Sequence, residues 1–320
     1  MNRRFALIQA VFSLVALGAV VWWASRQDAP ELPSGTGAIA WLVAGAGLYA
    51  LATLVRGERW HRILHRTGVD AKRSDSYGLT TVGYMGNNVL PARAGEMLRV
   101  VLLNKRTDAS KRTLIGTIVA ERLLDAIALA SIFVVVVFAV LRSTTLPSNR
   151  PFLMAGIAVG VLAALALAIW MLRRHHVVTR IREFMRPMAG APRALLSFEG
   201  LFLLAVSFAI WALEASVYLA VAQALGINMG AMDSLYVVAL TNLFAMIPAA
   251  PGYVGTFDAA VIFGLKAIGD SSQAAVSYLL LLRFLLFVPI TLVGLVVLVT
   301  RYGGWSRLRA AVRLETSRAT

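Results

Sequence analysis

Three charged side chains follow a proline in an otherwise apolar part of the sequence. Arg93, Glu96 and Arg99 are spaced three residues apart, so on a helix they form a stripe along one side. The stripe begins two residues after Pro91, where a preceding helix has to break. Free backbone N–H groups at the start of a helix, together with a guanidinium group, bind anions such as phosphate. The sequence therefore predicts an anion site at this break.

A second break with a similar pattern lies in the other half of the chain. Pro251, Gly252 and Gly255 interrupt an apolar segment, and Asp258 then falls in the first turn of the helix expected to start at Gly255. Paired helix breaks at corresponding positions of two halves are typical of the central site of a transporter. Both breaks are therefore candidate binding positions for one ligand.

Charged residues continue in the apolar segment that follows the first break. Glu121 and Asp125 lie four residues apart and share one helix face, with Arg122 beside them. A lone charge at the centre of a membrane helix costs at least about 2.5–3.5 kcal/mol, so these side chains have to pair or face water. We expect Arg93 and Arg99 to face Glu121 and Asp125 across a polar vestibule. An ion-pair scaffold without a binding role is the alternative.

Two more ionisable residues, Glu214 and Arg283, lie in the middle of long apolar segments of the second half. They either pair with each other behind the second break or line the route of a ligand. His61 and His65 have the spacing of metal ligands, but arginines surround them and no carboxylate completes a set. No metal site is therefore expected.

The composition is that of a polytopic all-α membrane protein. Mean hydropathy is +0.74, 59% of the 320 residues are hydrophobic and 15% are charged, which leaves too little charge for the surface of a soluble domain. Because the chain has no cysteine, disulfides, thiolate catalysis and cysteine-bound metals are excluded. We expect six helices to cross the membrane fully: residues 5–24, 38–55, 113–141, 151–172, 200–222 and 274–300.

The net charge of +15 is distributed in a way that predicts topology rather than nucleic-acid binding. Lysines and arginines cluster in residues 56–75, 104–112, 173–193 and 301–318. By the positive-inside rule these segments and both termini are cytoplasmic. Residues 76–103 must then enter and leave on the cytoplasmic side, as a re-entrant helical hairpin with arms that rise roughly 20 Å each. The same argument makes residues 231–268 a second hairpin, which opens to the outside.

Polar residues at the first hairpin tip have expected structural roles. Asn87 and Asn88 are expected to cap the second arm, and Pro91 to occupy its first turn. Residues 1–146 and 147–320 then form two repeats of inverted topology, each with two spans, a hairpin and a further span, and the second ends in a basic tail. The alternative is that both hairpins are kinked full spans.

Three ordered motifs resemble the transmembrane region of lysylphosphatidylglycerol synthases, a superfamily described as flippase-like. They are residues 86–96, Glu121-Arg122-x-x-Asp125 and residues 251–255, and the resemblance covers most of the chain. In the larger synthases this region is similar to a lipid-translocating module joined to a soluble aminoacyltransferase domain. The sequence ends soon after its last expected span, so the resemblance implies translocation without lipid synthesis. Asp258 departs from the pattern, because a glutamate closer to the glycines is expected there.

We therefore expect a protein of the bacterial cytoplasmic membrane that moves an anionic lipid, either a phospholipid or a polyprenyl-phosphate-type lipid, without converting it and without a cofactor or metal. The phosphate is expected at Arg93 and the turn from Asn88 to Pro91, between the two hairpin tips. A membrane-embedded lipid-modifying enzyme that uses Glu121 and Asp125 as acid and base is one alternative. A scaffold for a cytoplasmic lipid enzyme is another, and a homo-oligomer stays open.

Overall fold

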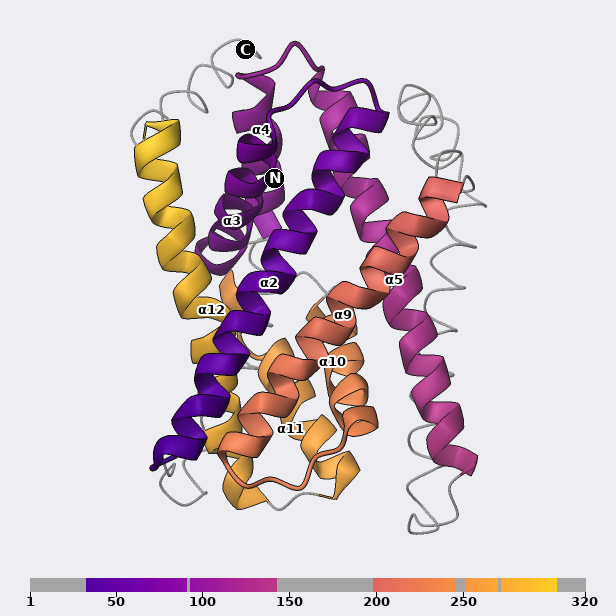
Figure 1. Cartoon of the computed structure of the whole chain (residues 1–320), viewed down its shortest axis with the longest axis vertical. Coiled ribbons are helices and arrows are strands. Elements are labelled where there is room, and N and C mark those ends of the chain that lie inside the picture. Colours follow the sequence, from indigo (N-terminus) through magenta and orange to yellow (C-terminus); the bar gives the residue numbers. More distant parts are fainter. Residues whose placement is uncertain (1–32, 91–92, 143–197, 246–250, 270–271, 304–320) are drawn as a thin grey trace, which may run out of the picture.

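The computed structural model describes residues 33–90, 93–142, 198–245, 251–269 and 272–303 (Figure 1). These residues form eight α-helices and one 3₁₀ turn, and no strand lies among them. In chain order the elements are α2 (Thr36–Arg66), α3 (Arg73–Val89), α4 (Ala94–Asn104), α5 (Lys111–Arg142), α9 (Phe198–Ala224), α10 (Ala231–Ala245), η2 (Pro251–Tyr253), α11 (Thr256–Ile268) and α12 (Ser272–Tyr302). The all-α class is confirmed for this part of the chain.

Four long helices coincide with four of the expected membrane spans. α5, α9 and α12 begin and end within two residues of the expected segments. α2, α9 and α12 are long and apolar enough to cross a membrane, as judged by length and composition. The expected spans 5–24 and 151–172, and both chain termini, lie outside the described residues.

α2 is longer than the sequence predicted. It continues past residue 55 to Arg66, into the segment expected to be a cytoplasmic loop. Arg56 and Arg59 therefore lie within the helix, where they are only 3% and 0% exposed. The expected loop boundary is wrong because both arginines pair with carboxylates of other helices, so their charge does not end the buried segment.

Two helical hairpins lie between the long helices. α3 and α4 form the first, and α10, η2 and α11 form the second. The loops into and out of the first hairpin lie at the upper end of the molecule in Figure 1, whereas the loop into the second hairpin, the end of α11 and the start of α12 lie at the lower end. α4 starts after Arg93, which has a left-handed backbone (φ 55°), and the second tip contains Gly252 (φ 64°) and Tyr253 (φ 54°) in the same region. Such positions are uncommon for residues with a side chain and cluster at functional sites.

The polar residues before the first break are not helix caps. Asn87 and Asn88 lie in the last turn of α3, and the α4 backbone receives no side-chain cap from the preceding residue, Arg93. Asn88 Nδ2 instead donates a hydrogen bond to Thr291 Oγ1 of α12 at 2.9 Å. The expectation that the asparagines cap the second arm is therefore wrong, because α3 continues through them. Pro91 lies outside the described residues.

Glycines let the two arms of the first hairpin touch backbone to backbone. A Cβ atom on Gly95 would lie 2.0 Å from the carbonyl oxygen of Gly83 and 2.5 Å from the backbone nitrogen of Asn87. A Cβ atom on Gly86 would lie 2.6 Å from the Cα atom of Gly95. Any side chain at these glycines would push the arms apart, so their small size fixes the geometry of the tip.

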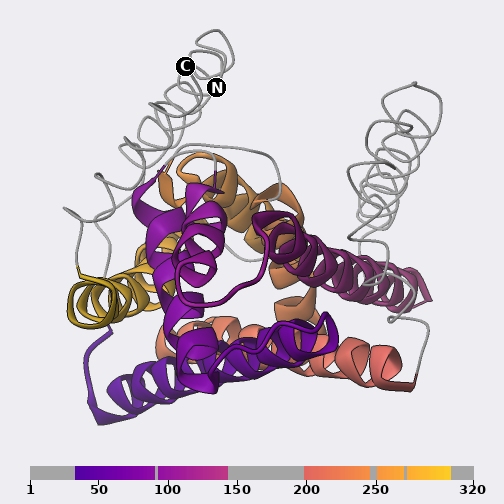
Figure 2. The same ribbon diagram turned by 90° about the horizontal axis from the view of Figure 1, so that it is seen from above.

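Each hairpin packs against the last long helix of the other half. α3 lies along α12, where a Cβ atom on Gly294 would come 2.5 Å from the Cβ atom of Met85, and α10 packs against α5. α2 and α9 run side by side, and seen from above α12 and α5 lie on opposite sides of the molecule (Figure 2). A buried core that includes Phe133, Tyr218 and Tyr278 joins α5, α9 and α12. The two halves of the chain are therefore interlocked.

Candidate functional site

The tips of the two hairpins meet inside the molecule. The Arg93 guanidinium group lies over the ring of Tyr253, 5.7 Å from its centroid. Gly252 is so close to Asn88 that an added Cβ atom would lie 3.5 Å from the Asn88 carbonyl oxygen. The two breaks that the sequence singled out are therefore neighbours in space.

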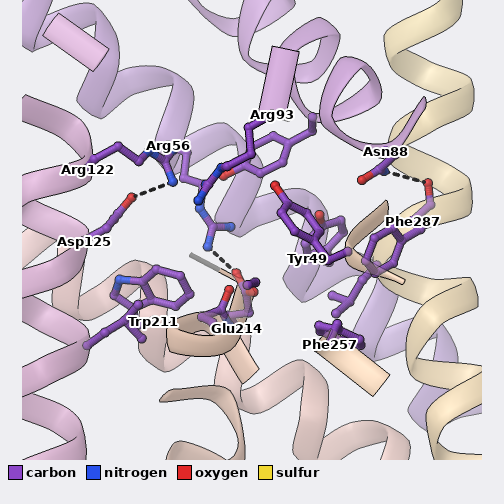
Figure 3. Close-up of a pocket in the computed structure, with 16 residues that line it drawn as sticks. Tyr49, Arg56, Asn88, Arg93, Arg122, Asp125, Trp211, Glu214, Phe257 and Phe287 are labelled. Carbon is purple, nitrogen blue, oxygen red and sulfur yellow. Dashed lines mark hydrogen bonds and ion pairs between the residues drawn. The ribbon is translucent and has the colours of Figure 1, made fainter. Parts of the chain in front are cut away.

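A pocket of about 100 Å³ lies where these tips meet the long helices (Figure 3). Three arginines and two carboxylates line it: Arg56, Arg93, Arg122, Asp125 and Glu214. Their charged groups converge on the same space in Figure 3. The pocket is smaller than the roughly 300–1,000 Å³ that holds a drug-sized ligand, so it fits a group of the size of phosphate rather than a whole lipid.

Aromatic side chains complete the lining of this central pocket. Arg56 lies between the rings of Tyr84 and Trp211, at 5.7 and 5.2 Å from their centroids, and its guanidinium group pairs with Glu214. The other aromatic residues of the lining are Tyr49, Tyr253, Phe257 and Phe287. Cation–π contacts hold a guanidinium group through its face, so its N–H edge stays directed at carboxylates or at an anion.

Arg122 of α5 connects the first hairpin to the acidic residues of α5. Its guanidinium group lies 3.5 Å from Glu96, 3.2 Å from Glu121 and 3.4 Å from Asp125. Arg93 pairs with Glu96 at 3.3 Å and so reaches the acidic residues through Glu96 and Arg122 rather than by direct contact. The side chains of Arg122 and Arg93 are 27% and 22% exposed, so neither is sealed off from the pocket.

Arg59 and Arg99 hold the same two acids from the other side. Arg99 Nη2 lies 2.9 Å from Glu121, as the sequence predicted. Arg59 Nη1 lies 2.7 Å from Asp125 and 2.6 Å from Ser207 Oγ of α9. The side chains of Arg59 and Glu121 are 0% exposed, and a buried charge without a partner is costly. These pairs therefore tie α2, α4, α5 and α9 together beside the pocket.

In the second half, Arg283 of α12 holds the second hairpin tip. It pairs with Asp258 and donates a hydrogen bond to the carbonyl oxygen of Gly252 at 3.3 Å. The Gly255 N–H donates to Asp258 Oδ2 at 2.8 Å, so Asp258 caps α11, whose start the sequence predicted. Pro251 begins the 3₁₀ turn η2 within this tip.

Glu214 and Arg283 do not pair with each other. Glu214 pairs with Arg56 of α2, and Arg283 pairs with Asp258. Of the two roles that the sequence left open for them, pairing is therefore wrong, and Glu214 lines the central pocket. Asn87 is 7% exposed, and in the described part of the chain its side-chain oxygen has no hydrogen-bond partner.

Arg56 and Arg59 were missed as site residues because the sequence assigned them to a basic cytoplasmic loop. The signal that could have found them is spacing, since Arg56, Arg59 and Trp60 follow an apolar segment directly at helical intervals. Among the residues that the structure describes, no group of three or more histidine or acidic side chains is placed to hold a metal ion.

Comparison with known proteins shows a family match along most of the chain. The family described as the lysylphosphatidylglycerol synthase TM region matches residues 7–294. A UPF0104 membrane protein of Methanothermobacter thermautotrophicus is 24% identical over 274 residues, which cover 77% of this chain and 80% of that protein. A UPF0104 membrane protein of Methanocaldococcus jannaschii is 25% identical over 218 residues, which cover 65% of this chain and 90% of that protein.

A longer relative is also similar. Glycosyltransferase AglD of Haloferax volcanii is 22% identical over 299 residues, and the match covers 79% of this chain but 47% of AglD. The chain thus spans about half the length of that relative. The resemblance that the three sequence motifs indicated is confirmed by the family match, and the chain belongs to the lysylphosphatidylglycerol synthase transmembrane-region family.

Proposed function

We propose that the protein moves an anionic, phosphate-bearing lipid headgroup across a membrane, with an anionic phospholipid or a polyprenyl-phosphate-type lipid as its substrate. The observation that carries the proposal is the meeting of two hairpin tips around a pocket in which Arg56, Arg93 and Arg122 converge. Guanidinium groups bind phosphate through paired N–H donors, and broken helices form the central sites of many transporters. The family name, which refers to a phospholipid, agrees with such a substrate.

Both hairpins are re-entrant in this proposal and dip into the membrane from opposite faces. From their numbers of residues, α3 and α4 are about 26 and 17 Å long, and α10 and α11 about 23 and 20 Å, all shorter than a hydrocarbon core of roughly 30 Å. The loops that lead into the two hairpins lie at opposite ends of the molecule (Figure 1). α2 and α12 run in one direction, and α5 and α9 run antiparallel to them. This order supports an inverted repeat.

The distribution of basic residues orients the protein. The basic residues of 56–75 and 104–112, apart from the buried Arg56 and Arg59, lie in the loops at the open end of the α3–α4 hairpin and in the helix ends beside them. The positive-inside rule places this end, and with it both termini, in the cytoplasm. The cytoplasmic membrane of a bacterium is the proposed location.

The charged network around the pocket has one more positive than negative group. Its members are Arg56, Arg59, Arg93, Arg99, Arg122 and Arg283 with Glu96, Glu121, Asp125, Glu214 and Asp258. A surplus cation inside a membrane protein is costly unless water or an anion compensates it. Arg93 Nε, moreover, is buried and has no hydrogen-bond partner among the described residues. A single phosphate charge balances the set and supplies an acceptor.

Transport follows from the position of the pocket between the tips. The chains of the lipid stay in the bilayer, while the phosphate replaces Glu96 or Glu214 as a partner of Arg93 or Arg56. Because Arg93 belongs to the first hairpin and its neighbour Tyr253 to the second, movement of either tip opens the pocket toward one face. Alternate movement of the two tips then exposes the headgroup to each side in turn.

The same contacts favour transport over lipid chemistry. An enzyme would use Glu121 and Asp125 as acid and base, and these groups would have to reach the substrate. Glu121 is fully buried between arginines and does not line the pocket, and Asp125 is held by both Arg59 and Arg122. We therefore propose that the lipid leaves the protein chemically unchanged.

Reconstitution of the purified protein into vesicles tests this proposal. Fluorescent phosphatidylglycerol and phosphatidylcholine are followed from one leaflet to the other with native protein, Arg93→Ala, Glu121→Gln and the exposed control Lys105→Ala. We expect the native protein and the control to move phosphatidylglycerol, and the first two variants to lose most of this activity. Equal rates of phosphatidylglycerol movement with native protein and with Arg93→Ala would contradict the proposal. Conversion of the lipid would identify an enzyme instead.

A further inference from the structure

A second pocket lies at the end of α2, away from the hairpin tips. Its volume is about 410 Å³, and the last turns of α2 and the starts of α3 and α9 form it. The end of α2 and the start of α9 lie at the upper end of the molecule in Figure 1. This volume is within the roughly 300–1,000 Å³ of small-molecule sites. We call this cavity the surface pocket.

The lining of the surface pocket is basic. It consists of Arg62, Arg66, Arg73, His61 and His65 with Glu58, Glu199, Phe202 and Leu203. Three arginines and two carboxylates give the lining one net positive charge. Glu58 is shared by Arg62 at 3.0 Å and Arg73 at 3.7 Å, so one carboxylate serves two arginines. The side chains of Arg62 and Arg73 are 49% and 69% exposed, so an anion can reach both.

Exposed apolar side chains border the basic lining. Phe198, Leu201 and Phe202 of α9 are 86%, 62% and 42% exposed. They belong to a helix that is long and apolar enough to cross a membrane. The guanidinium group of Arg62 lies over the Phe202 ring at 4.9 Å from its centroid. Basic groups beside an exposed apolar surface fit the level at which the phosphate of a lipid meets its chains, and a soluble anion would need no such border.

A line of arginines leads from the surface pocket to the central pocket. Along the seam between α2 and α9, four arginines of α2 each contact a residue of α9. From the surface inward the contacts join Arg66 to Glu199, Arg62 to Phe202, Arg59 to Ser207 and Arg56 to Glu214. Arg62 lines the surface pocket and Arg56 the central pocket, whereas Arg59 is fully buried between them. The seam is therefore closed in this structure.

We propose that the surface pocket binds the phosphate of an anionic lipid from the leaflet on the side of the basic loops. Arg62 and Arg73 hold the phosphate oxygens, and the chains of the lipid lie against Phe202. Binding at this pocket does not require transport. Its role as the place where a headgroup is taken up before it moves along the α2–α9 seam rests on the proposed function.

A single reporter tests the site. The chain has no cysteine, so Phe198→Cys gives one position for an environment-sensitive dye beside the pocket. The purified full chain in detergent is titrated with dihexanoyl phosphatidylglycerol, with dihexanoyl phosphatidylcholine and with inorganic phosphate. Each arginine near a membrane surface contributes about fivefold in affinity for an anionic lipid, so Arg73→Gln should raise the Kd for phosphatidylglycerol about fivefold and Arg62→Gln with Arg73→Gln about 25-fold.

Two further variants separate binding from damage to the fold. Lys105→Gln removes an exposed positive charge outside the surface pocket and should leave the Kd unchanged. Glu58→Gln frees Arg62 and Arg73 from their shared carboxylate, so it should tighten binding by about fivefold. Damage to the fold can weaken binding but does not tighten it. An increase in affinity in Glu58→Gln is therefore stronger support for the site than a loss of affinity in the arginine variants.

The outcomes distinguish the possible ligands. An unchanged Kd in the double arginine variant, or equal affinity for phosphatidylcholine, overturns the proposal. If inorganic phosphate competes only at a far higher concentration than phosphatidylglycerol, the result supports an anionic lipid as the ligand. If it competes at the same concentration, the lipid proposal is overturned and the pocket is a site for free phosphate. Arg93→Ala should bind with native affinity here. If native protein binds but moves no lipid in vesicles, the surface site stands and the proposed transport fails.

Discussion

Arg122 and Arg283 occupy equivalent places in the two halves of the protein. Each lies eleven residues after the first residue of the long helix that follows a hairpin, α5 for Arg122 and α12 for Arg283. Each pairs with the acidic residue at the third position of the second hairpin arm, Glu96 in α4 and Asp258 in α11. The same ion pair is thus built twice, once behind each tip.

This equivalence predicts similar defects from two changes that lie far apart in the sequence. Loss of a hydrogen bond to a charged group removes about 1.5–3 kcal/mol, so Arg122→Gln and Arg283→Gln should each slow phosphatidylglycerol movement in vesicles by about tenfold or more. Arg301→Gln, an exposed position on α12, is the control and should keep the native rate. A native rate for Arg283→Gln would show that the second tip is not part of the site.

Two arginines one helical turn apart on α2 should differ sharply in their effect on stability. Arg59 is fully buried against Asp125 and Ser207, so Arg59→Met leaves polar groups without their partner and should lower the free energy of unfolding by about 3–5 kcal/mol. Arg62 is 49% exposed, so Arg62→Met should cost less than about 1 kcal/mol. Thermal unfolding in detergent measures both, and equal midpoints would contradict the buried network.

A methyl group at the first hairpin tip should not be tolerated. Gly95→Ala places a Cβ atom 2.0 Å from the Gly83 carbonyl oxygen, which belongs to the backbone and has little room to yield. We expect a loss of about 3 kcal/mol or more in stability, at the upper end of overpacking effects. The matched control is Gly47→Ala, where an added Cβ atom has no neighbour within 4 Å. If both variants have the same midpoint of thermal unfolding, α3 and α4 are not in backbone contact.

Single cysteines in the loops test the hairpin topology. Asp70 and Asp108 flank the first hairpin on its two sides, and Asn228 lies in the loop before the second hairpin; all three are exposed. A membrane-impermeant thiol reagent should label Asp70→Cys and Asp108→Cys only from the cytoplasmic side, and Asn228→Cys only from the outside. The native chain, without cysteine, gives the background. Labelling of Asp70→Cys and Asp108→Cys from different sides would mean that α3 and α4 cross the membrane.

Most helices were predictable from sequence because the chain consists of apolar runs separated by prolines, glycines and basic clusters. α2 was the exception, since its apolar run stops at Arg56 although the helix continues. A buried arginine and a loop arginine look alike in a sequence. The difference lies in a partner, and Glu214, the partner of Arg56, is 158 residues away.

The meeting of the two tips was expected from the sequence, but the ion pairs around them were predictable only where both partners lie close in sequence. Helical spacing placed Glu121 and Asp125 on one face and brought Arg99 to Glu121. For Glu214 the sequence offered only Arg283 as a partner, because Arg56 was assigned to a loop, whereas the structure pairs Glu214 with Arg56. The rotation of α9 relative to α2 and α12 decides this pairing, and spacing along one helix contains no information about it.

The first arm of each hairpin packs against one long helix of its own half and one of the opposite half: α3 against α2 and α12, and α10 against α9 and α5. Each half of the chain therefore contains only part of the surface against which its own hairpin packs. A substitution in α5 or α12 can therefore disturb the seating of the hairpin that belongs to the other half.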